Sequence, residues 1–123
     1  MLSEIDIRDA LRDCYDPDVP CNIVDLGLVL SVTVSADLEA PGIGIRGVPE
    51  RYRVAIEVTL TNPSESAEAH LIGQITNRLA GLETVSQALV SVRSEPHWSP
   101  HRISPAGRRA LGLDGNPNLV QIR

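Results

Sequence analysis

The sequence predicts an α+β fold of two layers, in which a small mixed three-stranded sheet is covered on one face by helices. Segments with alternating apolar and polar residues, typical of strands, are separated by segments whose apolar residues have helical spacing. Their order along the chain is helix, strand, strand, helix, strand, helix. A chain of 123 residues is long enough for one compact core but not for two, so residues 1–123 are expected to form a single domain.

The first helix is expected near residues 4–14. Ser3 and Asp6 have the spacing of a capping box, and four apolar residues then fall on one helical face: Ile7, Ala10, Leu11 and Cys14. Residues 16–20, Asp-Pro-Asp-Val-Pro, must end this helix, because proline lacks an amide donor and disfavours a helical conformation in the residue before it. We therefore expect a stiff loop there, called the acidic loop below.

Two strands are expected next and should pair as a hairpin. In residues 29–35 the apolar side chains alternate with serine and threonine, and in residues 52–60 they alternate with polar or small ones. The connection, residues 36–51, holds three glycines and two prolines and is longer than a usual hairpin loop. We expect it to form a mobile or extended flap.

The C-terminal half should supply a second helix, a third strand and a short helix. Leucine and isoleucine at helical spacing predict a helix from Ser64 to Gly81, and weaker alternation predicts a strand over residues 86–93. Ser104 followed by Pro105 is a favourable start for a short helix that closes at residue 112. The tail from residue 114 onward should be loosely held.

Composition excludes several classes of function. The formal net charge is −5, with 16 acidic and 11 basic residues spread without long runs, so no footprint for nucleic acid or for an anionic membrane is present. The N-terminus has neither a signal sequence nor a membrane span, which predicts a cytoplasmic protein. Two cysteines, Cys14 and Cys21, are too few for a disulfide framework and are expected to be reduced.

Three groups of motifs, in the right order, resemble the SufT/PaaD-like family of small iron-sulfur cluster assembly proteins. They are the acidic loop with Asn-Ile-Val-Asp-Leu-Gly-Leu at 22–28, Thr-Leu-Thr at 59–61, and Glu-Pro-His-Trp at 95–98 with the Ile-Ser start at 103–104 of the last helix. The resemblance implies this order of elements and a role in assembling or maturing iron-sulfur clusters within a SUF-type system. It also implies contact with assembly proteins or apo-targets and transient handling of a cluster or metal ion.

The sequence departs from the family at the turn after the second predicted strand. The family usually has a cysteine there, within a threonine-x-proline-glycine-cysteine-proline motif, whereas residues 61–66 read Thr-Asn-Pro-Ser-Glu-Ser. Glu65 therefore replaces the cysteine. A thiolate suits iron-sulfur clusters, whereas a lone carboxylate suits harder ions and binds them weakly without partners.

Glu65 and Cys21 each have two interpretations. The Glu65 carboxylate could hold an ion or a cationic group of a partner, or it could be an ordinary acid in the first turn of a helix, where negative charge is favoured. Cys21 could supply a ligand in place of the missing cysteine if its thiol is exposed. If its side chain is buried, Cys21 acts only as a small hydrophobic residue.

Asp16 and Asp18 lie in the acidic loop and Asp25 follows it in the sequence. The family resemblance places this loop near Glu65. The three aspartates could form a site for a hard metal ion if at least three ligands converge. The alternative is structural, because an aspartate before proline commonly opens a turn and accepts hydrogen bonds from nearby backbone amides. The matched motifs also place four further residues at the expected cleft: Asn22, Gly27, Thr61 and Ser64.

His97 and Trp98 are candidates for contact with a partner, although Trp98 could instead anchor its segment against the core. No nucleophile elbow, phosphate-binding loop, dinucleotide fingerprint or paired-cysteine motif is present, so no enzyme activity is expected. A thiol- or carboxylate-dependent enzyme is the least favoured hypothesis, since neither a base nor an oxyanion stabiliser can be named near Cys21.

The leading hypothesis is a non-catalytic assembly or scaffold protein, expected to act by transient contacts and to form a homodimer that shares strands or faces. The second hypothesis is a diverged interaction module without metal chemistry. On the family resemblance, it would serve as an accessory factor for a multicomponent aromatic-acid oxygenase, as some members do.

Overall fold

The computed structural model describes residues 2–42 and 44–113, and it confirms the expected order of elements. These elements are α1 (Glu4–Leu11), β1 (Val29–Ala36), β2 (Tyr52–Val58), α2 (Glu65–Ala80), β3 (Val85–Val92), the 3-10 helix η1 (Pro100–Arg102) and α3 (Pro105–Ala110). The tail from Asp114, which is expected to be loosely held, lies outside the described residues.

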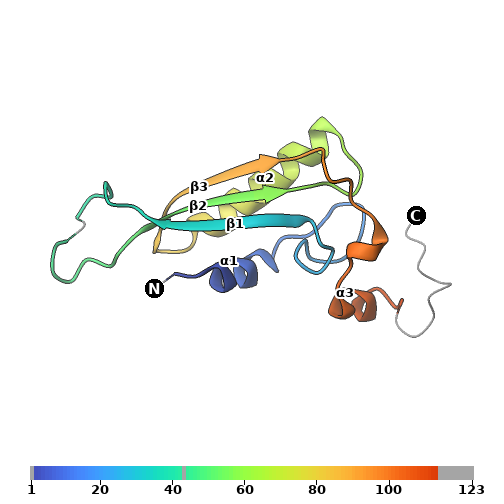
Figure 1. The fold of residues 1–123 in the computed structure, drawn as a ribbon, viewed down its shortest axis with the longest axis horizontal. Coiled ribbons are helices and arrows are strands. Elements are labelled where there is room, and N and C mark those ends of the chain that lie inside the picture. The colour runs from blue at the N-terminus through green and yellow to red at the C-terminus, as the bar shows by residue number, and fades with distance from the viewer. Residues whose placement is uncertain (1, 43, 114–123) are drawn as a thin grey trace.

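The three strands form one mixed sheet in the order β1-β2-β3 (Figure 1). The first two strands pair antiparallel, as the predicted hairpin requires, and β3 pairs parallel to β2. A parallel neighbour needs a crossover connection, and α2 supplies it between β2 and β3. The small mixed sheet predicted from the sequence is thereby confirmed.

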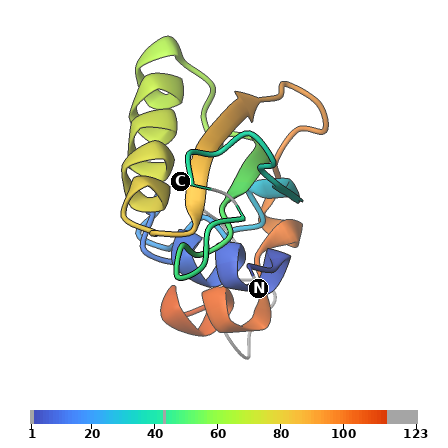
Figure 2. The same ribbon diagram turned by 90° about the vertical axis from the view of Figure 1, so that its left-hand side faces the viewer.

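Helices α1 and α2 form the second layer, on one face of the sheet (Figure 2). Helix α2 packs mainly on β3, whereas α1 packs on β1 and on α2. The core between the layers is made by side chains with almost no exposed surface, among them Ile7, Leu11, Ile56, Leu71, Ile75 and Leu79. Each such side chain contributes about 1.5–3 kcal/mol through burial. The other face of the sheet carries exposed residues, including Thr33, Arg53, Ala55 and Leu89.

Helix α1 is shorter than the sequence predicts, ending at Leu11 instead of near residue 14. Its last amides bond three residues back, as in Cys14 to the Leu11 carbonyl at 3.0 Å, so the helix tightens and closes. The Cys14 carbonyl then accepts the Ile23 amide at 2.9 Å, which draws the chain away from the helix axis. Cys14 is nevertheless buried, as its place in the apolar pattern predicts.

The strand patterns need two corrections. A register shift between Val29 and Ser31 interrupts the alternation predicted for β1, so Val29 and Val32 are both buried while Leu30 is only half-buried. Thr59, expected on the polar face, lies just beyond the end of β2 and is 3% exposed. Its amide donates to the Leu28 carbonyl at 2.9 Å, which carries the residue into the core.

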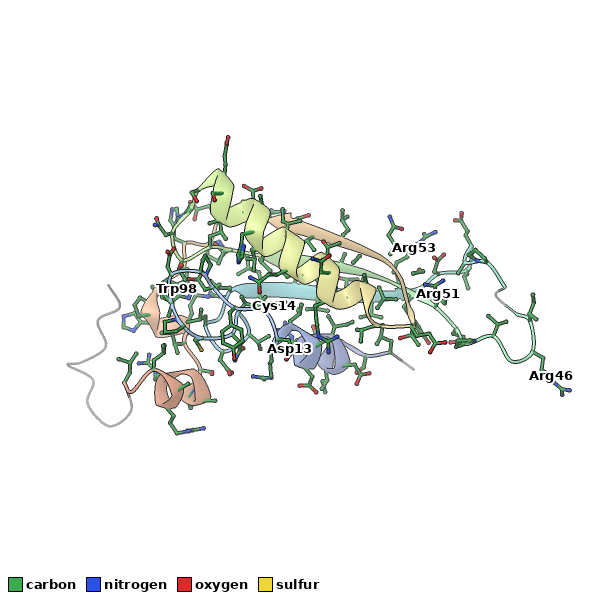
Figure 3. The ribbon with its side chains drawn as sticks, turned by 180° about the vertical axis from the view of Figure 1, so that it is seen from behind. Asp13, Cys14, Arg46, Arg51, Arg53 and Trp98 are labelled. Carbon is green, nitrogen blue, oxygen red and sulfur yellow. The ribbon has the colours of Figure 1, made fainter. Side chains whose placement is uncertain are left out.

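The connection between β1 and β2 projects beyond the sheet as a flap (Figure 1). Its base is closed by the Asp37 amide, which donates to the Arg51 carbonyl at 2.8 Å. Figure 3 shows Arg46 far out on this flap and Trp98 near the opposite end of the molecule. The flap is therefore remote from the family motifs in the acidic loop.

In the described part of the chain, no helix has the length and apolar character needed to cross a membrane.

Candidate functional site

Asp16 holds the acidic loop against the turn that follows β2. Its side chain is buried, and Oδ2 accepts the backbone amides of Asp18 and Val19, each at 2.8 Å. Oδ1 accepts the Thr61 hydroxyl at 3.0 Å. Since three donors from the protein use this carboxylate, its place in the structure matches the structural alternative, the aspartate that opens a turn.

Asp25 joins three segments that are distant in sequence. Its Oδ1 accepts Arg12 of the segment after α1 at 2.8 Å and the Ser104 hydroxyl at 2.9 Å, and its Oδ2 accepts the Asn22 side-chain amide at 2.7 Å. Burial alone would raise the pKa of Asp25, but these hydrogen bonds, with Asn22 first, outweigh burial and lower the pKa below the ordinary value. Asn22 and Asp25 therefore act together as a structural hub.

Gly27 and Trp98 fasten the C-terminal segment to the turn after Asp25. Gly27 has φ +77°, and a Cβ built there would lie 2.5 Å from the Arg102 carbonyl oxygen. The Trp98 Nε1–H donates to the Leu26 carbonyl at 2.6 Å, with the ring half-buried against the core. Trp98 thus lies as an anchor would. His97 is exposed, with Nε2 3.2 Å from a Glu95 carboxylate oxygen.

A hollow of about 300 Å³ lies between the acidic loop and the start of α2. It is lined by Pro17, Asp18, Asn62, Ser64, Ser66, Ala67 and His70. Ser64 is the N-cap of α2, and its hydroxyl accepts the Ala67 amide at 3.0 Å. We call this feature the loop–helix hollow. It borders two of the segments that carry the family resemblance.

Glu65 and Cys21 do not line the loop–helix hollow. Glu65 is the first residue of α2, and its exposed side chain lies beside the hollow. Cys21 is 3% exposed and packs in the core. Burial raises the pKa of the Cys21 thiol, and the negative charge of Asp25 raises it further. Cys14 is buried as well, so neither thiol borders the hollow.

The donor set of the loop–helix hollow does not fit a stably held iron-sulfur cluster. Its lining offers one carboxylate, from Asp18, and one imidazole, from His70, whereas clusters are held mainly by thiolates. Over residues 2–42 and 44–113, no three His, Cys, Asp or Glu side chains gather closely enough to hold a metal ion. Asp16, Asp18, Cys21 and Glu65 are therefore not brought together as a ligand set.

The site predicted by sequence omits several residues that line the hollow, among them Ser66 and His70, both on α2. Their spacing along α2 puts them on one side of the helix, one turn apart, together with the half-buried Ala67. That periodicity could have identified them once Ser64 was assigned as the cap. The contact between Asp25 and Ser104 had no comparable local signal, since Ser104 lies 79 residues away.

Comparison with known proteins assigns the family. Residues 4–92 match the model of the family described as iron-sulfur cluster assembly protein. An Fe-S protein maturation auxiliary factor of Porphyromonas gingivalis is 30% identical over 92% of this chain and 94% of its own length. The Fe-S protein maturation auxiliary factor YitW of Bacillus subtilis is 27% identical over 87% of this chain and 91% of its own.

Solved structures agree with this assignment. The crystal structure of a DUF59 domain of unknown function from Bacillus anthracis has a TM-score of 0.70 and 26% identity, covering 89% of this chain and 92% of that one. The solution structure of Rv1466 from Mycobacterium tuberculosis, a protein associated with Fe-S complex assembly and repair, has a TM-score of 0.50 and 28% identity, covering 89% and 84%. The chain described here belongs to the iron-sulfur cluster assembly protein family.

Proposed function

We propose that this chain is a non-catalytic accessory protein in the maturation of iron-sulfur proteins, working by transient contact with assembly proteins or apo-targets of a SUF-type system. The relatives named as maturation auxiliary factors support the accessory role. The proposed mode of action, docking of a partner, rests on the loop–helix hollow, where the acidic loop meets the first turns of α2.

The chemistry of the hollow suits a polar, cationic segment of a partner. Asp18 lines it, and the exposed carboxylates of Glu65 and Glu68 lie beside it in the first turn of α2. The chain as a whole carries a net charge of −5, which would speed its encounter with a basic partner. Serine hydroxyls at Ser64 and Ser66 add short polar groups that can orient a docked backbone.

A cluster handled by this protein would be cargo whose thiolate ligands come from the carrier or the target. Both thiols of the described chain are buried, and Glu65 replaces the family cysteine with a carboxylate. The protein would therefore position the two exchanging partners, and the ligand exchange would take place between them.

A docking module without any part in cluster transfer is the second candidate. The burial of Cys14 and Cys21 favours it, because a module of this kind needs the surface of the family fold but no thiolate. Its partner would then be an assembled multicomponent enzyme, for example an aromatic-acid oxygenase.

Docking is tested by titrating the purified chain with a cluster scaffold or carrier protein of the same organism and measuring the dissociation constant by calorimetry. Ser66→Arg places a bulky cation in the hollow and should weaken binding at least tenfold. Asn77→Arg adds the same side chain at an exposed position of α2 outside the hollow lining and should leave the affinity unchanged. Equal affinities for the two variants would refute docking at the hollow.

A separate experiment tests whether the chain itself holds a cluster. The purified chain is reconstituted anaerobically with iron and sulfide and is then examined by absorbance and metal analysis. We expect the chain alone to retain no cluster after desalting, and Cys21→Ser to behave identically. A cluster that the unmodified chain retains and Cys21→Ser loses would show that Cys21 is a ligand, contrary to the proposal.

A further inference from the structure

The segment that forms η1 and α3 has the opposite charge to the chain before it. Residues 1–95 hold 15 acidic and 7 basic residues, whereas residues 96–113 hold three arginines and no acidic residue. These arginines are Arg102, the last residue of η1, and Arg108 and Arg109 in the last turn of α3. A local excess of one sign in a chain of the other sign indicates a surface for a charged partner. We call the three residues the arginine surface.

The carboxylates of the described residues do not neutralise the arginine surface. Five other arginines each form an ion pair with an aspartate or a glutamate: Arg8, Arg12, Arg53, Arg78 and Arg93. Over residues 2–42 and 44–113, none of the three arginines of this surface forms such a pair. Arg102 and Arg109 are exposed, and Arg108 is half-buried. Their positive charges are therefore available to a partner.

Two hydrogen bonds hold the arginine surface in place. Arg102 Nε donates to the Gly27 carbonyl at 3.0 Å, and Arg108 Nη2 donates to the Pro100 carbonyl at 3.2 Å. The second bond joins α3 to η1, so these two short helices present one surface. A guanidinium group has five N–H donors, and both side chains therefore keep donors for a ligand. Groups that are already held in place lose little conformational freedom on binding.

The arginine surface and the loop–helix hollow lie at the same end of the molecule. Figure 1 shows α3 and the start of α2 at the end opposite the flap, and Figure 3 shows the same arrangement from behind. The hollow has acidic side chains in or beside it, from Asp18, Glu65 and Glu68. This end of the molecule therefore presents two surfaces of opposite charge.

We propose that the arginine surface binds a carboxylate-rich segment of a second partner protein while a basic partner occupies the loop–helix hollow. Guanidinium groups bind carboxylates in a bidentate geometry, and three of them match a short run of aspartates or glutamates. A nucleic acid fits less well, because its long run of phosphates would extend beyond three arginines along a strongly acidic chain. The simultaneous use of both surfaces rests on the proposed function, whereas the binding of carboxylates does not.

Binding is tested on the full chain with a fluorescently labelled peptide of six glutamates. A peptide of six glutamines is the neutral control. Fluorescence anisotropy at low ionic strength should show binding of the glutamate peptide only, and the affinity should fall as salt is added. Amide chemical shifts of the chain should change in η1 and α3 when the glutamate peptide is added.

Substitutions at Arg109 test the surface with little disturbance to the fold, because this side chain is exposed. Arg109→Glu should weaken binding about fivefold, and Arg109→Gln, which adds no opposing charge, about twofold. Arg46→Glu makes the same change of charge at an exposed position of the flap, at the other end of the molecule (Figure 3), and should leave the affinity unchanged.

Three results would overturn the proposal: no binding of the glutamate peptide, equal losses of affinity for Arg109→Glu and Arg46→Glu, or tighter binding of a DNA oligonucleotide of equal charge. Arg109 variants that lose thermal stability but no affinity would also overturn it, because Arg109 would then act only on the dipole of α3. A chain that binds the glutamate peptide but no cluster carrier would keep this inference and refute docking at the hollow. A chain that binds a carrier but not the peptide would do the reverse.

Discussion

The Ser104 hydroxyl donates to Asp25 Oδ1 at 2.9 Å and the Ser104 amide donates to the Asp25 carbonyl at 2.7 Å, although the two residues are 79 positions apart. This double contact joins the N-cap of α3 to the motif turn at the other end of the chain. Gly107 completes the contact, because a Cβ there would lie 3.0 Å from the Asp25 carbonyl oxygen. The first and the last of the matched motif groups thus meet in space at Asp25.

Asp25→Asn should lower the free energy of unfolding by about 2 kcal/mol at neutral pH, because it weakens charge-assisted hydrogen bonds from Arg12, Asn22 and Ser104. The pKa of Asp25 is lowered in the folded protein, so this contribution is present above the unfolded pKa of about 4 and is lost as pH falls through the folded pKa. Denaturant unfolding at several pH values should show that the difference in free energy of unfolding between Asp25→Asn and the unmodified chain becomes smaller in acid.

The matched control for that variant is Asp9→Asn. Its side chain is 67% exposed and lies 3.7 Å from the same Arg12, so the change should cost little. A loss for Asp9→Asn equal to that for Asp25→Asn, or a gap that does not narrow in acid, would contradict the role assigned to Asp25.

Gly27→Ala should be strongly destabilising. A Cβ would collide with Arg102, 2.5 Å from its carbonyl oxygen and 2.7 Å from its Cβ, in addition to the cost of φ +77°. Gly44→Ala has a similar φ, +82°, with no atom within 4 Å, and isolates that conformational cost of about 1 kcal/mol. The clash should add about 1–3 kcal/mol at Gly27. Thermal and denaturant unfolding compare the two, and equal losses would refute the close approach.

Both cysteines should be unreactive in the folded protein. Burial raises the pKa of the thiols of Cys14 and Cys21, and their exposures are 1% and 3%. An aromatic disulfide reagent at neutral pH should modify neither thiol on the timescale on which it modifies both in denaturant. Rapid modification of Cys21 in the native protein, located by peptide mapping, would show that its thiol is accessible and would support Cys21 as a ligand.

Trp98→Phe should reduce stability by about 1–2 kcal/mol, since the Leu26 carbonyl loses the indole donor at 2.6 Å. Because the ring anchors the C-terminal segment and lies outside the hollow lining, the affinity for a partner should be unchanged. Urea unfolding followed by circular dichroism measures the first effect and calorimetry the second. A variant with native stability and weakened binding would make Trp98 a contact residue.

Local signals explain which elements the sequence predicted well. The sequence predicts the second helix from Ser64 to Gly81, and the structure has these two residues as the caps of α2. A serine cap and apolar residues at helical spacing are short-range features that need no tertiary information. The sequence pattern extends α1 beyond its observed end at Leu11, because the hydrogen bond from the Ile23 amide to the Cys14 carbonyl, which draws the chain away from the helix, joins residues that are not close in sequence.

The candidate site was predictable only in part, for the same reason. The motifs identified Asp16, Asn22 and Asp25, but their roles depend on where their hydrogen-bond donors lie. Thr61, which donates a hydrogen bond to Asp16, is 45 positions away from it, and no pattern in the sequence predicts that contact. The burial of Cys21 likewise results from packing in the core, which periodicity does not reveal for a loop residue.

The central claim is that this chain supports iron-sulfur maturation through the loop–helix hollow. The most direct measurement is the activity of iron-sulfur enzymes in cells that lack the chain and are supplied with the unmodified protein, Ser66→Arg or Asn77→Arg at equal abundance. We predict that the unmodified protein and Asn77→Arg restore activity and that Ser66→Arg does not. Full restoration by Ser66→Arg, or no loss of activity when the chain is removed, would contradict the account.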